Sequence, residues 1–79
     1  MIEDSRLMFS LDKRLRRHQE TRRFSIHATE SGWEVLEERD SEVVRKVNLQ
    51  DWHRVARARR SIAIELDKLQ QKGWLEVPN

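Results

Sequence analysis

The fold is decided by residues 48–74, which read NLQDWHRVARARRSIAIELDKLQQKGW. Apolar residues recur on one side of this stretch at the spacing of an α-helix, and they are Trp52, Val55, Ile62, Leu66 and Leu69. We therefore predict a long helix over residues 49–72 that turns one face toward a core. The small Ala56 and Ala63 flank this stripe and would let the helix approach its neighbour closely.

Capping residues mark both ends of this helix. Asn48 is a good N-cap, and Asp51 would then lie at N3, where its charge favours the start of the helix. At the other end, Gly73 fits the C′ position. Leu69 and Trp74 are spaced for the apolar contact of a Schellman motif. The sequence thus predicts where the helix begins and where it ends.

Residues 22–49 predict a three-stranded antiparallel β-meander. The segments RRFSIHAT, WEVLEER and EVVRKVNL alternate apolar and polar residues, and only the short turns ESG and DSE separate them. Connections this short favour antiparallel pairing of consecutive strands. Taking the second turn as Asp40 to Glu42, the alternation places one set of apolar residues on the face toward the helix: Trp33, Val35, Val43, Val47 and Leu49.

A third segment, residues 5–20, predicts a short basic helix or arm, because Leu7, Leu11 and Leu15 recur every four residues. The expected fold class is α+β: a three-stranded antiparallel β-meander packed on a long C-terminal helix, with a short N-terminal helix (α-β-β-β-α). With 79 residues, the chain is expected to form a single small domain over residues 1–79.

Composition narrows the function classes. There is no cysteine, which excludes disulfides and thiolate metal sites. The sequence contains no run of about 18 apolar residues, so it predicts no membrane span. The start MIEDSRLMF lacks the features of a signal peptide. We expect a soluble cytoplasmic protein that does not engage a membrane.

No local motif predicts catalysis. The histidines His18, His27 and His53 fall on three different elements and lack metal-ligand spacing. There is no glycine-rich phosphate loop and no nucleophile elbow. We therefore expect a protein that is not an enzyme and binds no cofactor or metal.

Charge is segregated along the chain although the net charge is only +2. Six basic residues and one acid lie between Lys13 and Arg23, and four arginines and no acid lie between Trp52 and Ile64. Such basic segments can track the phosphates of nucleic acid. The candidate nucleic-acid-binding residues are His53, Arg54, Arg57 and Arg60 on the helix, and Lys13, Arg14, Arg16 and Arg17 in the first segment. The alternative is a solvated helix face, with the first segment lying against acids of its own chain.

Two further side chains suggest a pair beneath the helix. Arg59 falls inside the apolar stripe, and Glu37 shares a sheet face with Trp33 and Val35. We expect Glu37 and Arg59 to form a partly buried ion pair. The alternative is that Arg59 extends past its neighbours to solvent.

The other face of the sheet carries two apolar residues, Leu36 and Val44, which require a cover. Leu7, Leu11 and Leu15 could supply it within the chain or across a homodimer. These five residues are the candidate interface.

The run WEVLEERDSEVVRKVNLQDWHRVARA has a tryptophan-started strand, a polar turn, a basic strand and a helix. In this outline, residues 23–70 resemble the small DNA-binding domains of the AP2 and integrase amino-terminal type. The resemblance implies a three-stranded sheet against a helix, with the open sheet face reading the major groove. Here that face offers Glu34 and Glu38, which repel phosphate, so the helix and the Lys13–Arg23 segment are the better candidates.

The expected function is that of a small, non-enzymatic binding or regulatory protein that engages nucleic acid or an acidic protein partner through its basic helix. The alternative is a protein-interaction or homodimerising accessory protein that does not bind nucleic acid.

Overall fold

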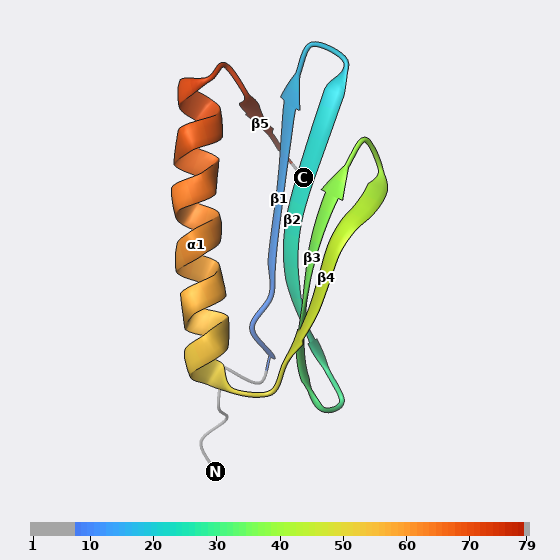
Figure 1. Ribbon diagram of the computed structural model, residues 1–79, viewed down its shortest axis with the longest axis vertical. Helices are drawn as coiled ribbons and strands as arrows, with labels where there is room; N and C mark the ends of the chain where they lie inside the picture. Colours follow the sequence, from blue (N-terminus) through green and yellow to red (C-terminus); the bar gives the residue numbers. More distant parts are fainter. Residues whose placement is uncertain (1–7, 79) are drawn as a thin grey trace.

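The computed structural model describes residues 8–78, which form a five-stranded antiparallel sheet with one helix across one face (Figure 1). The order of strands across the sheet is β4-β3-β2-β1-β5. The elements are β1 (Leu11–Arg17), β2 (Glu20–Thr29), β3 (Gly32–Arg39), β4 (Glu42–Leu49), α1 (Trp52–Gln71) and β5 (Leu75–Val77). The α+β class is confirmed, and β2, β3 and β4 form the expected meander, but the expected count of three strands is wrong because β1 and β5 extend the sheet to five.

Tight turns join the first four strands, and their backbone conformations explain their composition. His18 in the β1–β2 turn has φ 57°, and Asp40 and Ser41 in the β3–β4 turn have φ 52° and 70°. Left-handed residues give a two-residue turn the twist of its flanking strands. Gly32 follows the β2–β3 turn, and a Cβ there would overlap the carbonyl oxygen of Leu49. Glycine is therefore required where β3 starts beside the end of β4.

Helix α1 occupies nearly the expected residues, but its N-cap is Asp51 rather than Asn48. The Asp51 carboxylate accepts a hydrogen bond from the His53 backbone N–H at 2.9 Å. Asn48 is not available as a cap because it still pairs with Glu34 in the sheet. The C-terminal prediction is confirmed by two hydrogen bonds of the Schellman type. Trp74 N–H donates to Leu69 C=O at 3.0 Å, and Gly73 N–H donates to Gln70 C=O at 3.1 Å.

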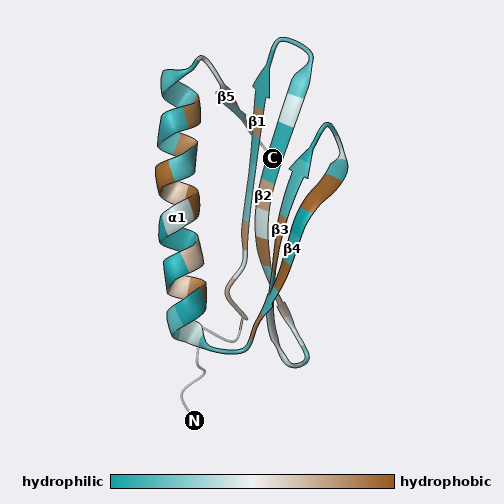
Figure 2. Cartoon of the chain, viewed as in Figure 1, coloured by the Kyte–Doolittle hydropathy of each residue, from teal (hydrophilic) through white to brown (hydrophobic). Residues whose placement is uncertain are grey.

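The core lies between α1 and the sheet, and most apolar residues of α1 turn toward it (Figure 2). Val55, Ile62 and Leu69 recur every seven residues, so all three lie on one side of the helix. They cluster with apolar residues of the strands and of the segment after the helix: Leu15, Phe24, Ile26, Trp33 and Trp74. Fully burying a large apolar side chain contributes ~1.5–3 kcal/mol, so this cluster is the main source of stability.

The expected N-terminal helix over residues 5–20 is wrong for the described part of that range. Leu11–Arg17 form strand β1, which pairs with β2 on one side and β5 on the other. The leucine spacing misled the prediction because positions i and i+4 share a face in a strand as well as in a helix. The edge of β2 and the short β5 both need a partner strand, and β1 supplies it. Residues 5–7 of the predicted helix lie outside the described residues.

The predicted face of Val43 is also wrong. A β-bulge opposite Glu37 and Glu38 shifts the register of β4, so that Arg45 pairs with Glu37 and Val43 pairs with Glu38. The extra residue sends Val43 to the face away from the helix, and Val43 is 56% exposed. Val47 and Leu49 keep the expected face toward α1.

Strand β1 places the Leu15 side chain in the core, where it is 1% exposed. We expect Leu15→Ala to lower the free energy of unfolding by about 2–5 kcal/mol, because it leaves a cavity in the core. Leu75→Ala removes the same atoms from a side chain that is 73% exposed, and it should cost less than about 0.5 kcal/mol. Urea denaturation of both variants measures the difference, and equal losses would contradict this placement of β1.

Candidate functional site

A groove lies between α1 and the β4 side of the sheet. Strands lie about 4.8 Å apart and a helix is about 10 Å wide, so one helix cannot cover five strands. The buried side of α1 packs with residues of β1, β2 and β3. The space left toward β4 has a volume of about 490 Å³, which falls within the ~300–1,000 Å³ usual for ligand pockets.

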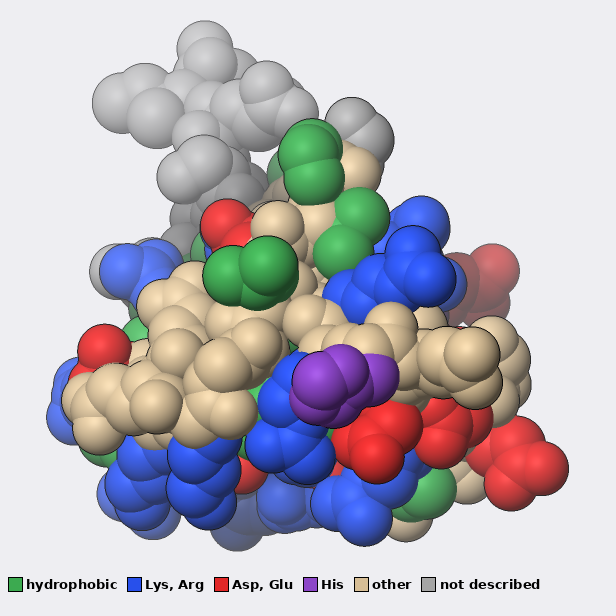
Figure 3. Space-filling view, turned by 90° about the horizontal axis from the view of Figure 1, so that it is seen from above, with side chains coloured by type: hydrophobic (Ala, Val, Ile, Leu, Met, Phe, Trp, Pro, Cys, Tyr) green, Lys and Arg blue, Asp and Glu red, His purple; other side chains and the backbone are tan. Residues whose placement is uncertain are grey.

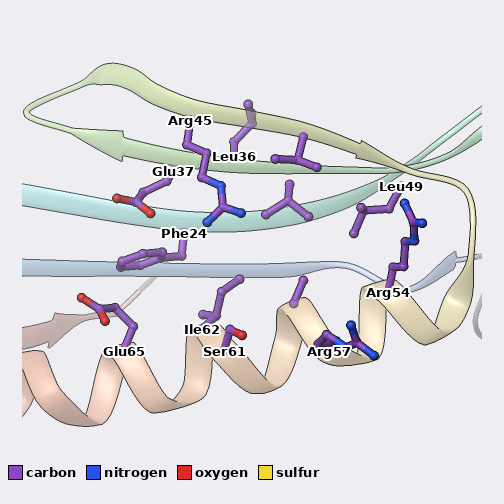
Figure 4. A pocket seen from close by; sticks show the side chains of 13 residues that line it. Phe24, Leu36, Glu37, Arg45, Leu49, Arg54, Arg57, Ser61, Ile62 and Glu65 are labelled. Carbon is purple, nitrogen blue, oxygen red and sulfur yellow. The ribbon is translucent and has the colours of Figure 1, made fainter.

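The groove has an apolar floor and a charged rim (Figure 4). Its floor is formed by residues of three strands and the helix, among them Phe24, Val35, Val47, Leu49 and Ile62. Arg54 and Arg57 line it near the start of α1, and the Arg45 side chain reaches in from β4. Glu37 and Glu65 lie toward its other end. A ligand in this groove would thus meet Arg54 and Arg57 at one end, then an apolar surface, and then Arg45 together with the two carboxylates.

Three arginines that line the groove, Arg45, Arg54 and Arg57, and Arg60 farther along α1 have no ion-pair partner in the described structure, unlike most cations of the β1–β2 hairpin. Within residues 8–78, no carboxylate lies within ion-pair distance of Arg45, Arg54, Arg57 or Arg60. All four side chains are exposed. Their positive charge is therefore available to a partner. We call these four residues the arginine cluster.

The open face of the sheet, by contrast, is internally neutralised. Arg23 donates two hydrogen bonds to Asp12, at 2.8 and 3.0 Å, and also lies 3.7 Å from Glu38. Farther along, Lys46 and His27 lie 3.3 and 3.2 Å from Glu34. The acids that were expected to repel phosphate, Glu34 and Glu38, are thus occupied by cations of neighbouring strands. This face presents little net charge to a partner.

The basic residues expected in the first segment do not join the arginine cluster. Alternation along β1 divides them between two faces, with Lys13 and Arg17 on the helix side and Arg14 and Arg16 on the open side. Lys13 pairs with Glu76, Arg17 with Glu20, and Arg14 with Asp12. At the end of the molecule that includes the β1–β2 turn, cationic and anionic side chains are interspersed (Figure 3). These contacts agree with the alternative prediction, in which the first segment lies against acidic residues of its own chain.

The expected pair of Glu37 and Arg59 is wrong, because Arg22 takes the place of Arg59. Arg22 Nη2 lies 3.3 Å from Glu37 Oε2, and both side chains are largely buried. The Arg22 guanidinium also lies over the rings of Phe24 and Trp74, at 5.4 and 5.9 Å. Arg59 is exposed and lies 5.8 Å from the ring centre of Phe9. The alternative prediction, that Arg59 extends past its apolar neighbours to solvent, agrees with this exposure.

The residues expected at an interface do not form one surface. Leu15 is buried in the core and Leu11 packs against it on the helix side of the sheet. Leu36 points to the open face, where it lies opposite Ser25 and Lys46. Val44 is exposed at the bulge of β4. Leu7 lies outside the described residues. Leu11 and Leu15 therefore cannot cover Leu36 and Val44.

The histidines remain on separate elements, with His18 in a turn, His27 on β2 and His53 on α1. Across residues 8–78 there is no group of three or more histidine and acidic side chains placed to hold a metal ion. In the same residues, no helix combines the length and the apolarity needed to cross a membrane.

Of the helix arginines named from the sequence, Arg54 and Arg57 line the groove and Arg60 does not, whereas Arg45, Ser61 and Glu65 line it and were not named. Alternation could have found Arg45, because it shares the face of Val47 and Leu49, which were expected to turn toward the helix. Ser61 and Glu65 follow Arg57 at intervals of four residues, and they continue the same flank of α1. The groove could not be found, because its width depends on the number of strands.

The Arg22–Glu37 pair predicts unequal effects for two arginine substitutions. Arg22→Ala should lower the free energy of unfolding by about 2–3 kcal/mol, because it strands the Glu37 carboxylate and removes packing on two rings. Arg59→Ala should cost less than about 1 kcal/mol, since it removes one exposed contact with a ring. Urea denaturation compares the two. A larger loss of stability for Arg59→Ala than for Arg22→Ala would support the Glu37–Arg59 pair predicted from the sequence instead.

The Asp12–Arg23 pair predicts a dependence of stability on pH. The hydrogen bonds from Arg23 hold the pKa of Asp12 below its ordinary value. A carboxyl group with a lowered pKa stabilises the fold above its unfolded pKa, and this contribution is lost as pH falls through the folded pKa.

We therefore expect Asp12→Asn to cost about 0.5–1 kcal/mol at pH 7, because both partners are partly exposed. In strong acid the variant and the wild type should converge. Thermal melts across pH measure this, with Glu30→Gln as a control that removes an exposed carboxylate without an ion pair in the described structure. A cost that stayed constant in acid would contradict the role of this pair.

Comparisons with known proteins add no assignment: no family model matches the chain, and neither a curated protein nor a solved structure is similar to it.

Proposed function

We propose that the chain is a small, non-enzymatic binding or regulatory protein that engages nucleic acid through its arginine cluster. The observation that carries this proposal is the unequal distribution of ion pairs. Cations on the open sheet face and in the β1–β2 hairpin mostly have carboxylate partners, whereas Arg45, Arg54, Arg57 and Arg60 have none in the described structure.

The placement of these arginines also supports a use outside the chain. Arg54, Arg57 and Arg60 lie in the first half of α1, where the helix dipole disfavours positive charge. The first turn of α1 has no acidic side chain in the described structure, and the one acid beside it, the N-cap Asp51, forms no ion pair with these arginines. A surface selected only for solubility usually mixes both signs of charge. An anionic partner would remove the electrostatic cost of this arrangement.

Phosphates are the anions that suit this surface best. A guanidinium presents planar donors that match two phosphate oxygens, and each phosphate neutralised on a nucleic acid releases condensed counterions. Arg54, Arg57 and Arg60 follow one another at intervals of three residues, about 4.5 Å along the helix axis, and their row turns gradually away from the groove. A strand that winds around the flank of α1 could place successive phosphates against them. Arg45 extends the cluster from α1 onto β4.

Salt-dependent binding tests this function. We expect the protein to bind DNA or RNA oligonucleotides at low salt, with an affinity that falls steeply as salt rises. The double variant Arg57→Ala with Arg60→Ala should bind more weakly. It should also reduce the slope of log affinity against log salt by about 1.4–1.8, the value for two lost phosphate contacts. Fluorescence anisotropy provides both readouts.

The matched control is Arg14→Ala with Arg16→Ala, which removes the same charge from the opposite face of the sheet. This control should change the affinity and the slope much less. An equal effect of the two double variants would mean that net charge, and not the arginine cluster, drives binding. No binding of any oligonucleotide at low salt would refute the proposed function.

A further inference from the structure

We infer that the groove between α1 and β4 receives one unpaired base of a single-stranded nucleic acid, while the arginine cluster holds the adjoining phosphates. This inference rests on the proposed function and narrows its ligand to a single strand. It concerns a part of the site that the phosphates alone would leave empty, namely the apolar floor and the Glu65 end of the groove.

The order of chemical groups along the groove matches that of a nucleotide. Arg54 and Arg57 lie at one end, an apolar floor follows, and Glu65 lies toward the other end (Figure 4). A nucleotide presents an anionic phosphate, then two flat base faces, then an edge with N–H donors. The Arg45 side chain enters between the sheet and the helix, where a guanidinium can stack on a base.

Glu65 is the residue that selects among anionic ligands. It is partly buried at the groove, and within residues 8–78 it has no hydrogen-bond or ion-pair partner. Glu37, by contrast, is already paired with Arg22. A fatty acid would place an alkyl chain with no donor against Glu65, and an acidic peptide would bring further carboxylates toward it. The amino and imino groups of a base are donors that a free carboxylate can accept.

A base of a duplex can enter this groove only if it is first removed from its stack and its pair. In a duplex each base is stacked and paired, and extruding it costs a few kcal/mol in general. The bases of a single strand are free to enter. Phosphate attraction alone favours the opposite order, because a duplex carries the higher density of charge. The preference between the two forms therefore reports on the groove rather than on the arginine cluster.

The first experiment compares a mixed-sequence DNA strand with a duplex of the same length at one salt concentration, by fluorescence anisotropy. We expect the single strand to bind at least about tenfold more tightly, since extrusion of a base is avoided. Poly-glutamate serves as the probe for an acidic peptide. Tighter binding of the duplex would overturn the inference, and so would binding of poly-glutamate as tight as that of the single strand.

The second experiment uses the sign of a charge change. Glu65→Gln removes a negative charge, so binding to phosphates alone would become stronger. We expect the single strand to bind at least about fivefold more weakly, because a base loses its charged acceptor. Asp67→Asn makes the same charge change two residues away, on an exposed side chain that does not line the groove. It should leave binding unchanged or strengthen it slightly.

The two proposals fail differently. If neither DNA form binds at low salt, the proposed function is refuted together with this inference. If both forms bind, and Glu65→Gln behaves like Asp67→Asn or binds more strongly, the inference is overturned while the phosphate-binding function stands. Circular dichroism melts of both variants exclude a loss of folding as the cause of weaker binding.

Discussion

The apolar stripe of α1 and its position on the sheet govern the rest of the structure. Val55, Ile62 and Leu69 share a cluster with Leu15 and Phe24. Because these contacts centre the helix on β1, β2 and β3, the face of β4 is covered only near Leu49. The groove is thus a consequence of packing one helix against a sheet wider than itself. The arginines occupy positions where the core ends and solvent begins.

Charged side chains of the open sheet face form ion pairs with one another, whereas the arginines that line the groove on the helix side have none in the described structure. On the open face, acids and bases of adjacent strands lie opposite or diagonal to each other, and diagonal pairs such as Asp12 with Arg23 neutralise one another. On the helix side, the flank of α1 is the element that faces β4 across the groove. That flank supplies Arg54 and Arg57, and Arg45 meets no carboxylate at ion-pair distance in the described structure. The difference explains how a chain of net charge +2 can leave several arginines of one region without carboxylate partners in the described structure.

The long helix and the meander could be predicted from the sequence because their signals do not depend on distant residues. The C-terminal cap, for instance, needs only Gly73 and its neighbours. The segment of Leu11 and Leu15 failed because a spacing of four residues suits both a helix and a strand, and only pairing with β2 and β5 decides between them. The predicted face of Val43 was wrong because a β-bulge cannot be recognised from the alternation of apolar and polar residues. The sequence named Arg54 and Arg57, which line the groove, but the groove itself depends on the number of strands beside the helix.

The pairing of β1 with β5 has a consequence for how the chain reaches its folded state. Each earlier pair of strands is closed by a short turn, but Leu75 pairs with Arg16 and Val77 with Arg14, across almost the whole described chain. Contacts so distant in sequence carry the largest loop-closure cost and form late. During synthesis on a ribosome, β1 therefore keeps one edge open until the last strand has emerged. Until then, that edge is free to pair with another chain.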